Sequence, residues 1–158
     1  MLEGIFQAVQ NSHFAVAIGQ LNNAWGILAQ FFHIAGLILV LLSVVLVNLR
    51  LLGLGLVAQS SAELAALTRP WLLYGLGFLV FSGLFMLLPS AALYYPNPAL
   101  WFKFKLLAVA LILQFGLSRY VLARPAPARI LAISYAIASL VLWFGVGLAG
   151  RAIGFMAA

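Results

Sequence analysis

Long apolar segments separated by short polar ones organise this chain. Four of these segments reach the length of about 20 residues that a helix needs to cross the hydrocarbon core of a bilayer. They comprise residues 25–48, 70–88, 99–121 and 130–150. The first, second and fourth contain no formally charged residue. The pattern predicts an all-α integral membrane protein, a four-transmembrane-helix bundle that forms a single membrane domain over residues 1–158.

Residues 2–22 have a different, amphipathic pattern. At about 100° per residue, apolar side chains gather on one side of a helix and polar side chains on the other. The apolar stripe comprises Leu2, Ile5, Phe6, Val9 and Val16, and the polar side comprises Glu3, Gln7, Gln10 and Asn11. This pattern predicts one interfacial helix ahead of the first span. Asn22 and Asn23 then supply a turn and a helix N-cap.

The composition excludes several classes of function. Hydrophobic residues make up 66% of the chain and charged residues 6%, whereas a soluble domain carries about 25% charge. The absence of cysteine excludes disulfides and thiolate metal sites. The chain has no aspartate and two glutamates, both outside the spans, so it lacks the paired carboxylates of acid-base catalysis and a hydrolase is disfavoured. The net charge of +6 is spread over helix ends, which does not suit nucleic-acid binding.

Positive charge is distributed unequally between the two sides of the predicted bundle. The connections between spans one and two and between spans three and four are flanked by Arg50, Arg69, Arg119, Arg124 and Arg129. The opposite side carries Lys103, Lys105 and Arg151. The positive-inside rule therefore predicts that the arginine-rich side is cytoplasmic. In a bacterial inner membrane, both termini would then be periplasmic.

His33 is the one histidine inside a predicted span. Hydrocarbon offers its ring nitrogens no water, so an intramembrane histidine predicts a functional site. At 1.5 Å per residue it lies about 12 Å below the helix end near Trp25. It shares a small, polar face with Gly26, Ala29, Gln30, Gly36 and Leu37. Ser82 and Gly83 of the second span are expected near the same depth, in the outer leaflet.

Lys103, Lys105 and Arg151 lie on the side that topology does not favour for cations. One interpretation is that they are anchors whose charged tips reach the interface. The other is that they form an anion-binding ring around the His33 site. Such a ring suits heme propionates, the region of a quinone headgroup, or an anionic lipid.

Several short motifs occur in a fixed order along the chain. They are Phe32-His33-Ile34-Ala35-Gly36, Asn48-Leu49-Arg50-Leu51-Leu52-Gly53, Ser82-Gly83, Asn97-Pro98 with Lys103 and Lys105, and Gly150-Arg151-Ala152-Ile153-Gly154. In these motifs the chain resembles a family of small bacterial inner-membrane proteins of unknown function, distantly similar to the membrane domain of copper-resistance protein D. The resemblance spans most of the chain after residue 20 and implies four helices in a bacterial membrane, without a reaction. That family usually has an acidic residue in place of Asn48.

A b-type heme protein is the first functional hypothesis. Heme iron takes one or two axial side chains, usually histidine and sometimes methionine. His33 is the expected first ligand, and Met86, His13 or His33 of a symmetry mate is the second. Lys103, Lys105 and Arg151 would hold the propionates. The predicted role is electron transfer between the periplasmic side and the quinone pool.

Two alternatives remain open beside heme. Small residues in spans one, two and four favour helix association, which suits a non-catalytic scaffold, a homo-oligomer or an accessory subunit of a membrane complex. Copper handling follows from the distant resemblance, but copper(I) prefers thiolate and thioether ligands, and the chain has three methionines and no cysteine. The alternative to a ligand role for His13 is a position at the level of the lipid headgroups, where it binds nothing.

Overall fold

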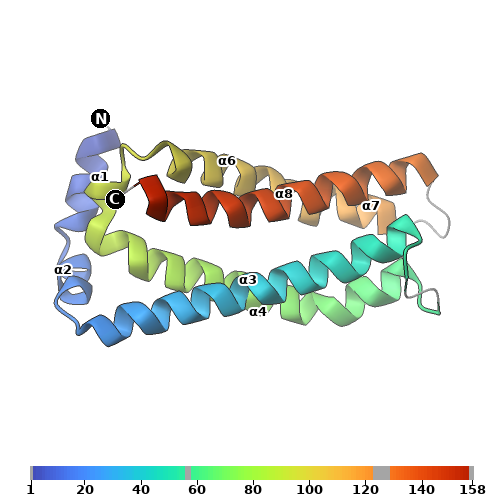
Figure 1. Ribbon diagram of the computed structural model, residues 1–158, viewed down its shortest axis with the longest axis horizontal. Helices are drawn as coiled ribbons and strands as arrows, with labels where there is room; N and C mark the ends of the chain where they lie inside the picture. Colours follow the sequence, from blue (N-terminus) through green and yellow to red (C-terminus); the bar gives the residue numbers. More distant parts are fainter. Residues whose placement is uncertain (1, 56–57, 123–128, 157–158) are drawn as a thin grey trace.

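The computed structural model describes residues 2–55, 58–122 and 129–156, and within these ranges the chain is helical, without strands (Figure 1). Four helical segments are long and apolar enough to cross a membrane. They are α3 (Asn23–Leu52), α4 (Ser61–Leu87), α6 (Pro98–Ile112) with its continuation through η2 (Leu113–Leu117) and α7 (Ser118–Leu122), and α8 (Arg129–Met156). The predicted fold class, an all-α multi-pass membrane bundle, is confirmed.

Helices α3 and α4 pack along each other through two glycines. A Cβ atom built on Gly36 would lie 2.7 Å from the carbonyl oxygen of Gly75, and one built on Gly75 would lie 2.7 Å from the carbonyl oxygen of Gly36. Only residues without a side chain allow the two backbones to come this close. These glycines of spans one and two therefore serve packing within the chain.

The second pair of helices is α6 and α8, and contact between α3 and α8 joins the two pairs (Figure 1). The core at this junction comprises Val40, Val44, Leu72, Ala110, Trp143 and Val146. Outside it, large apolar side chains such as Phe81 and Leu148 are exposed, as expected where lipid is the solvent. In the described ranges α4 packs mainly on α3, and it has few contacts with α6 and α7.

Helix α4 begins with a capping box. The backbone amide of Glu63 donates to Ser60 Oγ at 3.1 Å, and the backbone amide of Ser60 donates to Glu63 Oε2 at 2.8 Å. From this cap the helix continues through Pro70 to Leu87. The prediction that the second helix begins at Pro70 is therefore wrong. The proline has no N–H, so it removes one bond of the helix ladder without ending the helix.

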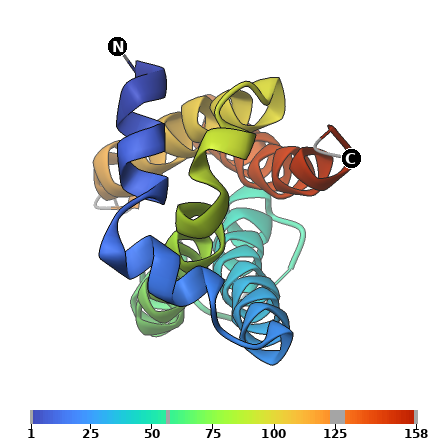
Figure 2. The ribbon, with the colours of Figure 1, turned by 90° about the vertical axis from the view of Figure 1, so that its left-hand side faces the viewer.

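The N-terminal segment forms two helices, α1 (Leu2–Gln10) and α2 (His13–Gly19), and the prediction of one helix over residues 2–22 is wrong. Ser12 caps α2 by accepting from the backbone amide of Ala15 at 3.3 Å, which allows a new helix direction there. Figure 2 shows α1 and α2 lying across one end of the bundle.

Two contacts attach α1 to the connection between α4 and α6. The ring of Phe6 lies 5.2 Å from that of Tyr95 and 5.8 Å from that of Trp101, centroid to centroid. Gln10 Oε1 accepts from the backbone amide of Ala92 in α5 (Ala91–Tyr94) at 2.8 Å. Gln10 therefore faces the bundle, contrary to the expectation that it belongs to the outward polar side. Asn22 caps α3 as expected, accepting from the amide of Ala24 at 3.2 Å.

Candidate functional site

His33 of α3 and Ser82 of α4 face each other across the helix pair. His33 Nδ1 lies 2.9 Å from Ser82 Oγ. A Cβ atom on Gly83 would lie 3.3 Å from His33 Cε1, so the glycine leaves room for the imidazole ring. The expectation that Ser82 and Gly83 lie level with His33 is confirmed. The close contact of Gly36 with Gly75 brings the two helices near enough for this pair to form.

The hydrogen bonds of Ser82 define the tautomer of His33. Ser82 Oγ also bonds to the carbonyl oxygen of Phe78, and a carbonyl only accepts. The single hydroxyl proton of Ser82 therefore goes to Phe78, and Ser82 Oγ must accept from His33 Nδ1–H. A neutral imidazole protonated at Nδ1 has a free lone pair at Nε2. No described residue bonds to Nε2, and this atom is not among the buried polar atoms, so its lone pair is accessible to a ligand.

Lys103 of α6 is a half-buried cation that lies against α8. Its Nζ atom lies 3.4 Å from the point where a Cβ atom on Gly150 would be, so it extends along α8 where that helix has no side chain. The contacts of His33 thus bring together His33, Ser82 and Gly83, from two helices.

The other predicted site residues are placed less closely around His33. Met86 is half-buried on α4, one helical turn beyond Ser82. His13 is exposed on α2, and Lys105 is exposed on α6. Arg151 is exposed, with its guanidinium carbon 5.0 Å from the centre of the Phe155 ring. In the described ranges no three His, Cys, Asp or Glu residues form a metal-binding group.

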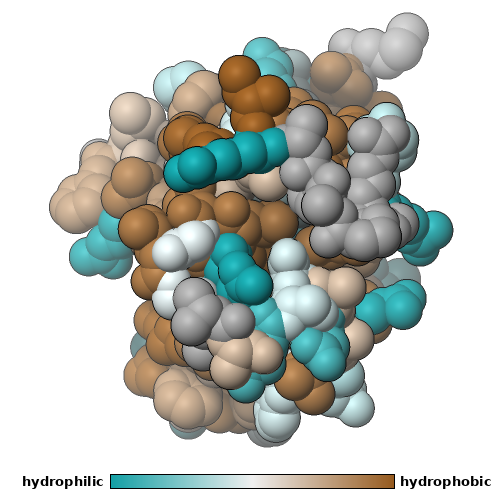
Figure 3. All heavy atoms as spheres, turned by 90° about the vertical axis from the view of Figure 1, so that its right-hand side faces the viewer, coloured by the Kyte–Doolittle hydropathy of each residue, from teal (hydrophilic) through white to brown (hydrophobic). Residues whose placement is uncertain are grey.

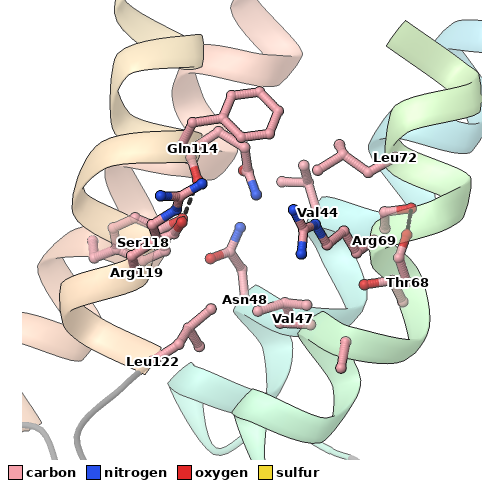
Figure 4. Close-up of a pocket in the computed structure, with 15 residues that line it drawn as sticks. Val44, Val47, Asn48, Thr68, Arg69, Leu72, Gln114, Ser118, Arg119 and Leu122 are labelled. Carbon is pink, nitrogen blue, oxygen red and sulfur yellow. Dashed lines mark hydrogen bonds between the residues drawn. The ribbon is translucent and has the colours of Figure 1, made fainter. Parts of the chain in front are cut away.

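A second polar site lies at the opposite end of the bundle, where α4 and α8 begin. Figure 3 shows hydrophilic side chains across the otherwise largely hydrophobic surface of this end. A cavity of about 280 Å³ opens here between α3, α4, η2, α7 and α8 (Figure 4). Its polar lining residues are Ser43, Asn48, Thr68, Arg69, Gln114, Ser118, Arg119 and Tyr135. Arg124, which belongs to the predicted basic turn, lies outside the described residues.

Asn48 is the most deeply buried polar residue of this cavity, with 2% of its surface exposed. Its Nδ2 donates to Ser139 Oγ at 3.0 Å, and its Oδ1 has no partner in the described chain. Tyr135 of α8 lies in the same lining and is buried. One polar atom of the Asn48 amide is thus hydrogen-bonded, and the other is not.

Helix η2, a short π-helical segment, forms one wall of the cavity and places Gln114 on it. Such segments are rare and frequently occur at functional sites. The sequence pattern did not predict this cavity, because Asn48 was assigned only to the end of a span. The available signal was the presence of Gln114 and Ser118 in the third span at the level of the arginines.

One comparison with known proteins gives a match. The model of a family of unknown function, DUF6644, matches residues 6–156. No curated protein and no solved structure matches the chain. The predicted resemblance to a family of unknown function is confirmed, and the match covers both polar sites.

Proposed function

Since this chain belongs to DUF6644, a family of unknown function, we propose its activity from its own residues. It is a membrane-embedded b-type heme protein with His33 as an axial ligand. Its role is electron transfer between the periplasmic side of a bacterial inner membrane and the quinone pool. The observation that carries this proposal is the hydrogen bond between His33 and Ser82, with Nε2 left free.

A histidine that ligates a metal generally donates its other ring N–H to an acceptor, which fixes the tautomer and the ring orientation. Ser82 supplies that acceptor, because its own proton is committed to Phe78. The ring is therefore held with Nε2 directed away from α4. Nε2 is the nitrogen that would bind the iron.

Lys103 fits the charge of a heme. Its half-buried ammonium suits a propionate carboxylate, and the chain offers it few acidic partners, since only two glutamates are present. Gly83 accommodates the ring of His33, and Gly150 accommodates the side chain of Lys103. Heme, when bound, supplies one-electron chemistry. His33 would hold it, Ser82 would orient His33, and Lys103 would balance the charge.

Met86, His13 and His33 of a second copy are the candidates for a second ligand. Met86 lies on α4 one turn from Ser82, whereas Nε2 of His33 is directed away from α4. The distant similarity to the membrane domain of copper-resistance protein D stays a prediction, as does the scaffold role. The glycines that favoured association with other chains are in part used inside this one, at Gly36 and Gly75.

A reduced-minus-oxidised absorption spectrum tests the proposal. The protein is expressed with an adequate heme supply and purified in mild detergent. We expect a Soret band and an α band in the wild type and their loss in His33→Ala. A colourless wild type refutes heme binding. Bands that persist in His33→Ala and disappear in His13→Ala refute the choice of ligand.

A further inference from the structure

The cavity at the arginine-rich end has two cationic walls. Arg69 comes from α4 and Arg119 from α7, and both line the cavity. Figure 4 shows their side chains extending into the cavity from opposite sides, with Asn48 between them. The gap between α4 and α7 is thus bordered by two guanidinium groups that face a common space.

The protein supplies little negative charge to balance these guanidiniums. The whole chain has eight Lys and Arg residues and two glutamates. Glu63 accepts from both the backbone amide and the hydroxyl of Ser60, and Glu3 lies in α1 at the other end of the bundle (Figure 1). A counter-anion strongly stabilises a cation that lies beside the hydrocarbon region. An external anion therefore suits this cavity better than any carboxylate of the chain.

The chemistry of the lining specifies the anion further. Guanidinium groups present planar pairs of N–H donors that match the oxygens of phosphate. Gln114 adds an amide on the wall between them. The cavity therefore presents guanidinium and amide donors that suit a phosphate.

We infer that this cavity binds a phosphate group between Arg69 and Arg119. Two sources offer that group, the headgroup of an anionic lipid and free inorganic phosphate. The apolar part of the lining suits the glycerol backbone and acyl chains of a lipid, and comprises Val44, Val47, Leu72, Phe115 and Leu122. The site is independent of the proposed heme function, since it lies at the other end of the bundle.

Thermal unfolding of the delipidated protein in detergent tests the inference. Dioleoyl phosphatidylglycerol is titrated, with the zwitterionic dioleoyl phosphatidylcholine as the lipid control. We expect phosphatidylglycerol to raise Tm. In Arg69→Gln and in Arg119→Gln the half-saturating concentration rises about tenfold, and the double variant does not respond. Arg129→Gln, which removes an exposed arginine at the same end outside the cavity lining, should respond as the wild type does.

A parallel titration with inorganic phosphate, at constant ionic strength, separates the two sources. A response to phosphatidylglycerol alone identifies a lipid headgroup, and a response to inorganic phosphate that needs both arginines identifies a free anion. Equal responses in the wild type and the double variant overturn the inference, as does no response of the wild type to either probe. If the glutamine variants do not fold, Arg69→Lys and Arg119→Lys decide, because they keep the charge and lose the planar donor pair.

Discussion

The Nδ1 atom of His33 lies 2.9 Å from the hydroxyl oxygen of Ser82, and Ser82 gives its own proton to the carbonyl of Phe78. This chain of two hydrogen bonds makes His33 Nδ1 a donor and leaves Nε2 as a lone-pair donor to a ligand. An intramembrane histidine that needed only to satisfy its own polar atoms would use both nitrogens. Ser82 is therefore a positioning residue for whatever His33 binds.

Replacing Ser82 by alanine removes the acceptor of His33 Nδ1–H. We expect the affinity for heme to fall by about 10- to 100-fold, as for other residues that orient metal ligands. The heme-to-protein ratio after a heme titration of the apoprotein measures this effect. Ser82→Thr keeps the hydroxyl and should restore binding.

A matched control for Ser82→Ala is available on α3. Ser43→Ala also removes a buried hydroxyl that donates to the carbonyl four residues earlier, that of Leu39, but it does not touch His33. Its heme-to-protein ratio should equal that of the wild type. Equal losses in the Ser43 and Ser82 variants would contradict a specific role for Ser82.

The contact of Gly36 with Gly75 should make the pairing of α3 and α4 sensitive to a single methyl group. In Gly36→Ala the new Cβ atom would lie 2.7 Å from a backbone oxygen, so the helices must separate. We expect a loss of about 1–3 kcal/mol in the free energy of unfolding, as for an overpacked core. Unfolding by denaturant in detergent measures the loss. Gly77→Ala, on the same helix pair but facing open space, should not destabilise the protein.

An internal carboxylate should compete with the inferred phosphate ligand. Asn48→Asp places an anion in the cavity that Arg69 and Arg119 line. We expect the response of Tm to phosphatidylglycerol to disappear, because the guanidiniums then have a counter-ion within the chain. Gln59→Glu adds the same charge at an exposed position near this end and should leave the response intact. An unchanged response in Asn48→Asp would mean that the ligand lies elsewhere.

The charge arrangement predicts that the arginine-rich end is cytoplasmic. A reporter fused after Ala158 should therefore be active if it is alkaline phosphatase, which functions in the periplasm. It should be dark if it is a fluorescent protein that folds only in the cytoplasm. The reverse pair of signals would invert the orientation and place the His33 site in the inner leaflet.

The sequence predicts the depth of the His33 site better than it predicts the extent of α4. The depth of His33, Ser82 and Gly83 follows from counting residues, because every helix rises 1.5 Å per residue from an interface. The capping box at Ser60 marks the start of α4. That the same helix continues through Pro70 does not follow from local signals, since proline is typical of a first helical turn.

The cavity at the other end was not predicted for a further reason. Its polar residues come from helices far apart in sequence, and only the rotation of each helix decides whether Asn48, Gln114 and Arg119 face one another. The hydrophobic pattern defines that rotation poorly in a membrane, because lipid-facing and core-facing side chains are equally apolar. The π-helical turn at Leu113–Leu117 changes the rotation of the third span once more.

Chemical rescue of His33 is the sharpest test of whether this residue binds heme. In His33→Gly the imidazole ring is missing, and added free imidazole can occupy the space beside Ser82 and Gly83. If His33 binds heme, the α band of the reduced protein is lost in His33→Gly and returns when imidazole is added. An α band that is unchanged in His33→Gly without imidazole would contradict it, and so would a wild-type protein that binds no heme.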